Sequence, residues 1–175
     1  MRGWQIALVA AACLACGGGV AAAADIKAEI HKVTATGSGE AVGTVTISDG
    51  GAIKTALKGL PPGPHGLHIH QNGSCDPATP AGGQPVAAGG AGGHFDPQNT
   101  GKHEGPQGSG HLGDLPLLQV GADGAANATL TAPHLKDIAA LKGKAVVIHA
   151  GGDNYSDQPQ PLGGGGARIA CGVLQ

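Results

Sequence analysis

Hydrophobic and polar residues alternate along several stretches of the chain. Over residues 26–31 the order is Ile-Lys-Ala-Glu-Ile-His, and a similar period of two continues over residues 44–48 and 53–57. Successive side chains of a β-strand point to opposite faces, so this pattern predicts strands with one buried face. Asp49-Gly50-Gly51 lies between two of these runs and predicts a tight turn.

The rest of the chain predicts more short strands but little helix. Asp123-Gly124 is a second turn signal, and residues 133–141 allow only a short helical turn. The further strands are expected at residues 66–70, 117–120, 127–131, 146–149 and 167–174. Many short strands without a strong helix favour an all-β antiparallel sandwich or barrel.

Two long segments lack this alternation. Residues 71–115 are dominated by Gly, Pro, Asn and His, and residues 150–166 are again rich in glycine. Loops this long inside a small domain are normally functional or disordered. The first segment also contains four groups that can bind metals, so we interpret it as functional.

The first 24 residues have the layout of a secretory signal peptide. Arg2 gives a positive start, residues 4–15 are almost wholly apolar, and residues 21–24 are all Ala. We expect cleavage after this run, which leaves residues 25–175 as one domain in the periplasm or another exported location.

Two alternatives concern this N-terminal segment. One is a buried first helix, and the other is a lipid anchor at Cys16, although the residues before Cys16 fit the lipoprotein pattern poorly. No later segment is apolar enough to span a bilayer.

Export bears on the two cysteines that remain after cleavage, Cys75 and Cys171. An exported protein with an even pair usually bridges them, whereas the alternative is two unrelated buried thiols. A bridge would close a loop that contains most of the domain. The loop-entropy relation predicts that such a bridge raises the free energy of unfolding by up to about 4–5 kcal/mol.

Composition limits both the core and the partners. Beyond residue 24 the only aromatic residues are Phe95 and Tyr155, so the core must consist of Val, Ile, Leu and Ala. The formal net charge of the whole chain is only −2. Nothing in this charge suggests a nucleic-acid partner.

The nine histidines of the chain suggest metal chemistry. His68 and His70 lie two apart in a predicted strand, so their rings share one face and can hold one metal ion. The long loop adds three histidines and a carboxylate, a set that zinc accepts: His94, His103, His111 and Asp114. The alternative is that each histidine is simply a solvent-exposed loop residue, which explains each one singly. A metal ion would also stabilise a loop that has little hydrophobic core of its own.

Longer motifs resemble one family throughout residues 25–175. The chain resembles the copper/zinc superoxide dismutases, particularly the exported bacterial type. The motifs are His65-Gly66-Leu67-His68-Ile69-His70, Gly73-Ser74-Cys75, Gly92-Gly93-His94-Phe95-Asp96-Pro97, His103-Glu104-Gly105-Pro106, Gly110-His111-Leu112-Gly113-Asp114-Leu115-Pro116, His149-Ala150-Gly151-Gly152-Asp153-Asn154-Tyr155-Ser156-Asp157 and residues 161–172.

The resemblance implies a flattened eight-stranded Greek-key barrel with one copper and one zinc ion per subunit. The implied copper ligands are His68, His70, His94 and His149. The implied zinc ligands are His94, His103, His111 and Asp114. His94 would then bridge both metals as an imidazolate and pass a proton to the product.

The same resemblance gives roles to four more residues. Asp153 would connect a copper ligand with a zinc ligand, and Cys75 would be bridged to Cys171. Arg168 would attract the superoxide anion beside copper, since its guanidinium stays charged. The implied reaction converts two superoxide anions and two protons to oxygen and hydrogen peroxide.

Several interpretations stay open. Residues 150–166 contain no lysine, so Lys102, beside His103, is our candidate for steering the substrate. His65 is expected to bind backbone groups near the site. Rival functions are a non-catalytic metal-binding module and a zinc hydrolase. The subunit is either a monomer or part of a homodimer.

Overall fold

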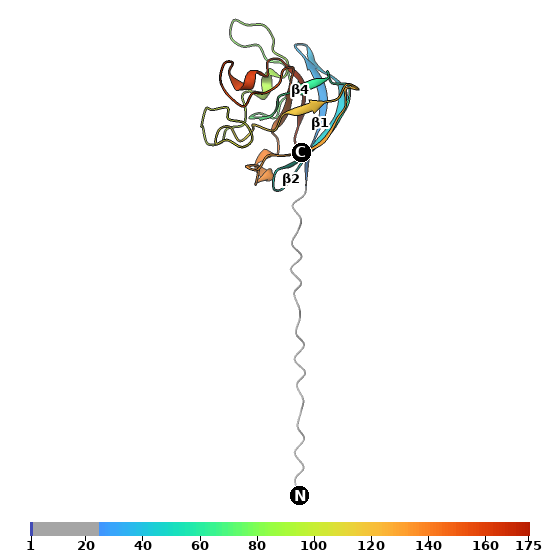
Figure 1. The fold of residues 1–175 in the computed structure, drawn as a ribbon, viewed down its shortest axis with the longest axis vertical. Helices are drawn as coiled ribbons and strands as arrows, with labels where there is room; N and C mark the ends of the chain where they lie inside the picture. Colours follow the sequence, from blue (N-terminus) through green and yellow to red (C-terminus); the bar gives the residue numbers. More distant parts are fainter. Residues whose placement is uncertain (2–24) are drawn as a thin grey trace.

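The computed structural model describes Met1 and residues 25–175 (Figure 1). The expected signal peptide, apart from Met1, and Cys16 lie outside the described residues. The described residues form nine strands: β1 Ile26–Thr34, β2 Gly37–Ser48, β3 Ala52–Leu57, β4 Gly63–His65, β5 Leu67–His70, β6 Leu118–Val120, β7 Ala126–Thr131, β8 Ala145–His149 and β9 Arg168–Val173. Three 3₁₀ turns join them: η1 Gly89–Ala91, η2 Ile138–Leu141 and η3 Leu162–Gly164.

The strands form one large curled sheet and one small sheet, both antiparallel (Figure 1). The large sheet has the order β5-β8-β9-β1-β2-β3-β7, and β4 pairs with β6. The pairs β5–β8, β9–β1 and β3–β7 join strands that are distant in sequence, as Greek-key connections do. The predicted all-β class is confirmed, and the nine strands become eight if β4 and β5, separated only by Gly66, are counted together.

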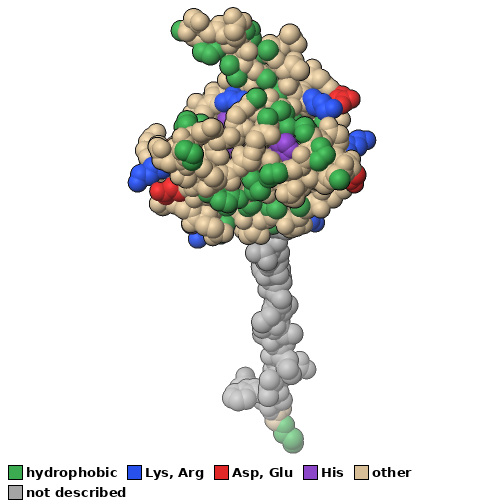
Figure 2. Space-filling view, turned by 45° about the horizontal axis from the view of Figure 1, so that its top comes forward, with side chains coloured by type: hydrophobic (Ala, Val, Ile, Leu, Met, Phe, Trp, Pro, Cys, Tyr) green, Lys and Arg blue, Asp and Glu red, His purple; other side chains and the backbone are tan. Residues whose placement is uncertain are grey.

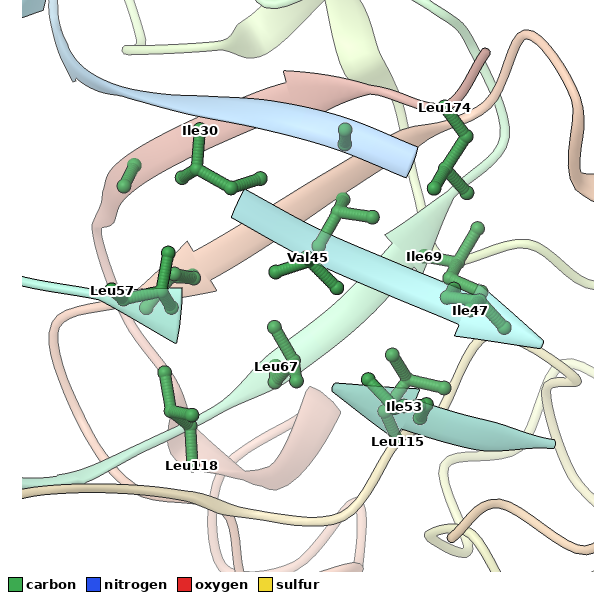
Figure 3. Close-up of a cluster of buried hydrophobic side chains, with 14 of the residues drawn as sticks. Ile30, Val45, Ile47, Ile53, Leu57, Leu67, Ile69, Leu115, Leu118 and Leu174 are labelled. Carbon is green, nitrogen blue, oxygen red and sulfur yellow. The ribbon is translucent and has the colours of Figure 1, made fainter. Parts of the chain in front are cut away.

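Alternating burial explains the strands. In β1 the buried residues Ile26, Ala28 and Ile30 alternate with the exposed Lys27 and Glu29. β3 shows the same pattern, with Ile53, Thr55 and Leu57 buried. The inward side chains form a core of aliphatic residues, and Figure 3 shows how those of β2, β3 and β5 meet. Phe95 only packs against its edge, so the core is aliphatic as predicted.

β5 and β8 differ because every residue in them is buried. Leu67 and Ile69 of β5 face the main core, so His68 and His70 face the opposite side. The long loops cover that side and gather on one side of the strands (Figure 1). The fold therefore buries two histidines between the sheet and two loops.

The predicted bridge is present and joins the first long loop to β9. Cys75 and Cys171 form a disulfide with Cα atoms 5.7 Å apart. Cys171 belongs to a second small core with Val147 and Ala91, against which Cys75 packs. No helix in the described part of the chain is long and apolar enough to cross a membrane.

Candidate metal centre

The first long loop reaches the histidine face of β5 as an additional strand-like segment. The backbone of Phe95 donates to the carbonyl of Ile69 at 2.8 Å, and the backbone of Ile69 donates to Gly113 at 2.9 Å. A Cβ on Gly113 would lie 2.2 Å from the Ile69 carbonyl oxygen, so only glycine permits this approach. These contacts place His94 and Asp114 beside the strand histidines.

Strands β8 and β9 supply the other wall. His149 ends β8 and is paired with Arg168, the first residue of β9. Both residues therefore lie where the sheet meets the loops. His65 acts here as predicted, since its Nδ1 contacts the carbonyl oxygen of His149 at 2.7 Å and its Nε2 contacts that of Pro61 at 2.8 Å.

Three overlapping groups of potential ligands result, of which two have four members and the third consists of His68, His103 and Asp153. In each group the ligand atoms lie within 4.8 Å of one another. The first group is His68, His70, His94 and His149, and the second is His94, His103, His111 and Asp114. His94 belongs to both four-membered groups. The structure thus brings together every residue that the sequence suggested as a ligand.

Hydrogen bonds leave one free nitrogen on each ring of the first group. His70 donates from Nδ1 to the Gly92 carbonyl (2.9 Å), and His149 donates from Nδ1 to the Gly166 carbonyl (3.1 Å). Their Nε2 atoms then face each other at 3.4 Å, each with a lone pair. His68 donates from Nε2 and keeps its Nδ1 free. A metal ion fits such convergent lone pairs.

The second group also contains buried nitrogen atoms without a hydrogen-bond partner. Nδ1 of His103 and Nδ1 of His111 are unpartnered, although they lie 3.0 Å and 3.3 Å from the Asp114 carboxylate oxygens. His94 Nδ1 lies 2.9 Å from the same carboxylate, while its Nε2 is free. Buried polar atoms are normally paired, so these orphaned nitrogens indicate that both groups fit a metal ion.

Asp153 connects the two groups. Its Oδ2 accepts from His68 Nε2 and its Oδ1 accepts from His103 Nε2, both at 2.7 Å. The carboxylate side chain is completely buried. It therefore fixes which nitrogen of each ring is free, as carboxylates beside metal-bound histidines commonly do.

Burial and nearby carboxylates shift the pKa values of individual histidines in opposite directions. Burial lowers the pKa of His68 to about 3 and that of His149 to about 4, and it holds the pKa of His70 well below the usual value. These rings are therefore neutral at neutral pH, the form that binds metals. Burial also acts to lower the pKa of His103, but Asp114 and Asp153 outweigh it and raise that pKa to about 9.

A cavity of about 330 Å³ opens onto the first group. His70, His94 and His149 line it, and Arg168 is the only Lys, Arg, Asp or Glu among the described residues that line it. Figure 2 shows histidine side chains within hollows, with most charged side chains toward the edge of the same face. Arg168 donates to the carbonyls of Ala88 and Gly92, both at 2.5 Å, so its position is fixed by the first long loop.

The site also includes Asp157, whose role the sequence did not reveal. Asp157 accepts from the backbone of His103 at 2.9 Å and from that of Leu162 at 3.1 Å, so it ties the two long loops together. The loop has no alternation of hydrophobic and polar residues, so its sequence does not indicate this contact. Lys102 is exposed and does not line the cavity, and its steering role stays a prediction.

Comparison with known proteins identifies the family. A sequence model of the copper/zinc superoxide dismutases matches residues 41–174. The chain belongs to the copper/zinc superoxide dismutase family. The superoxide dismutase (Cu-Zn) 2 of Salmonella typhimurium is 58% identical over 174 residues, which cover 98% of this chain and 99% of the relative.

Solved structures agree with this identification. The copper/zinc superoxide dismutase of Brucella abortus is 50% identical and superposes with a TM-score of 0.84. The monomeric copper, zinc superoxide dismutase of Salmonella enterica is 59% identical, with a TM-score of 0.76. Each comparison covers 87% of this chain and all of the other. The protein is a superoxide dismutase that uses copper and zinc, with the Greek-key barrel of its family.

Proposed function

We propose that the first histidine group holds copper and the second holds zinc, with His94 shared between them. The observation that carries this assignment is the set of buried, unpartnered ring nitrogens that converge in each group. The second group includes a carboxylate and three imidazoles, a set that zinc prefers. The first group consists of neutral imidazoles beside a cavity, which suits copper.

Copper, when bound, supplies the one-electron redox change of the reaction, because zinc has no accessible change of oxidation state. The residues of the chain bring the substrate and the proton to that point. Arg168 places a fixed positive charge in the cavity and so attracts the superoxide anion. His94 also lines the cavity, and its free Nε2 is the atom that takes up and releases the proton.

One experiment tests this assignment. Copper and zinc content and superoxide consumption are measured for the wild-type protein and for Arg168→Ala and Arg168→Lys, before and after copper is removed. Activity should vanish with copper and return when copper is added back. Arg168→Ala should keep both metals and lose about tenfold in rate, while Arg168→Lys should lose less. Full activity in copper-free protein would overturn the assignment of copper, and full activity in Arg168→Ala would overturn the role of Arg168.

We also propose that the protein is exported after loss of residues 1–24 and acts as a monomer. The apolar N-terminal segment supports export. The relative named as monomeric, which is 59% identical, supports the oligomeric state. A mass spectrum of the mature protein should begin at Asp25, and light scattering should give the mass of one subunit. A retained leader or a dimer mass would contradict the respective part.

A further inference from the structure

Tyr155 lies in the loop after β8, outside both ligand groups and outside the cavity. The residue is 38% exposed, so burial of its ring contributes little to the core. Its backbone φ is +57°, a conformation that bulky residues rarely adopt. Such strain persists only where the surrounding structure imposes it, so the contacts of Tyr155 must hold this conformation.

Three contacts hold this tyrosine. Its Oη accepts a hydrogen bond from the backbone of Leu117 at 2.8 Å. Its own backbone N–H donates to Asp153 Oδ1, also at 2.8 Å. Its ring lies against Gly105, where an added Cβ would come within 2.6 Å of the ring carbon Cγ. The side chain therefore joins its own loop to two other segments of the chain, and the backbone N–H holds Asp153 within that loop.

Each of these segments carries a residue of the metal centre. Leu117 follows the proposed zinc ligand Asp114 by three residues, and Gly105 follows His103 by two. Asp153 is the carboxylate that receives the ring N–H of both His68 and His103. The hydrogen bond from the Tyr155 N–H to Asp153 Oδ1 spans only two residues and closes a local turn within this loop.

We infer that Tyr155 is a positioning residue, which fixes Asp153 and through it the rings of His68 and His103. This inference rests on the ligand assignment proposed above. The phenol hydroxyl anchors the loop to the segment after Asp114, and the backbone N–H holds one oxygen of the Asp153 carboxylate. Weakening of this anchor lets the His103 ring turn, and zinc is then released faster.

The test compares Tyr155→Phe with a matched control. Tyr155→Phe keeps the ring and removes only the hydroxyl, which leaves the Leu117 N–H without its acceptor. Thr55→Val is the control, because Thr55 Oγ1 also accepts from a backbone N–H, that of Ala128 at 3.1 Å, and donates to the Ala126 carbonyl at 2.8 Å, but it lies in β3 away from the metal centre. A general loss of stability affects both variants, whereas a positioning role affects only the first.

The measurement is the rate of zinc release from the fully loaded protein into an excess of a chromophoric chelator. Tyr155→Phe should release zinc about tenfold faster, and Thr55→Val should stay within about twofold of wild type. With Co²⁺ in place of zinc, the visible spectrum of Tyr155→Phe should change and that of Thr55→Val should not.

Two results would overturn the inference: wild-type zinc release in Tyr155→Phe, or equal acceleration in both variants. Asp114→Ala separates this failure from failure of the ligand assignment, because a chain that keeps zinc without Asp114 contradicts the assignment itself. Tyr155→Leu removes the ring as well and should release zinc faster than Tyr155→Phe. If it does not fold, the comparison with Thr55→Val still decides.

Discussion

At the scale of single residues, the site depends on buried nitrogen atoms that have no hydrogen-bond partner among residues 25–175. Asp153 accepts a hydrogen bond from one nitrogen of His68 and from one nitrogen of His103, so the other nitrogen of each ring has no hydrogen-bond partner. The sequence predicted the shared face of His68 and His70, because a period of two needs only local geometry. The contact of Asp153 with His68 and His103 could be predicted only from the family motif. A loop without alternating hydrophobic and polar residues does not show which of its residues meet.

Gly163 illustrates how closely the loop packs on this centre. A Cβ at this position would lie 2.0 Å from Asp153 Oδ1 and 2.8 Å from His103 Nε2. Gly163→Ala should therefore displace the Asp153 carboxylate and weaken zinc binding by about tenfold or more, as measured by chelator competition. Gly50→Ala is the control, since Gly50 has a similar positive φ of +81° but no neighbour within 4 Å. Equal zinc binding in the two variants would show that the clash is harmless.

At the scale of elements, the strands were more predictable than the loops. Alternation indicated β1 and β3 correctly, and residues 133–141 contain only the expected short turn. Strand β2 begins at Gly37, earlier than its alternating residues suggested. Its first residues still pair with β1, but the register between the two strands shifts there, which interrupts the alternation. Strand β4 was not predicted, since the surrounding prolines and glycines give no alternation.

The disulfide joins an element of the sheet to an element of the site. It connects β9, which begins with Arg168, to the loop whose Ala88 and Gly92 carbonyls hold the Arg168 side chain. Loss of this bridge should therefore affect the position of the cation as well as stability, which falls by at most about 4–5 kcal/mol.

Cys75→Ser should lower superoxide turnover even in protein that contains both metals. Denaturant unfolding measures the stability, and turnover per bound copper measures the effect on the site. The double variant Cys75→Ser with Cys171→Ser controls for a reactive free thiol and should lose the same fraction of turnover. Unchanged turnover in the fully loaded single variant would refute the positioning role of the bridge.

At the scale of the whole molecule, the charge distribution sets how the substrate arrives. The net charge is −2 and the second long loop carries no lysine, so attraction of an anion must be local. Charged side chains lie mostly toward the edge of the face in Figure 2. Arg168 is fixed inside the cavity, and Lys102 is an exposed cation beside the proposed zinc ligand His103.

Lys102→Glu should lower the bimolecular rate constant and weaken its dependence on salt, because an attractive charge is replaced by a repulsive one. Rates measured over a range of ionic strength test this. Lys54→Glu is the control, since it makes the same change of charge at an exposed position of β3, outside the site. A salt profile equal to that of wild type would remove Lys102 from the steering role.

The proposed metal centre depends on one ring, that of His94, which contacts two ions. Diffraction from crystals of the fully loaded protein, recorded on either side of the copper and zinc absorption edges, locates each element separately. We predict copper where His68, His70 and His149 converge, zinc beside His103, His111 and Asp114, and one nitrogen of His94 on each ion. A His94 ring bound to a single ion in oxidised crystals, or zinc alone in both positions, would contradict it.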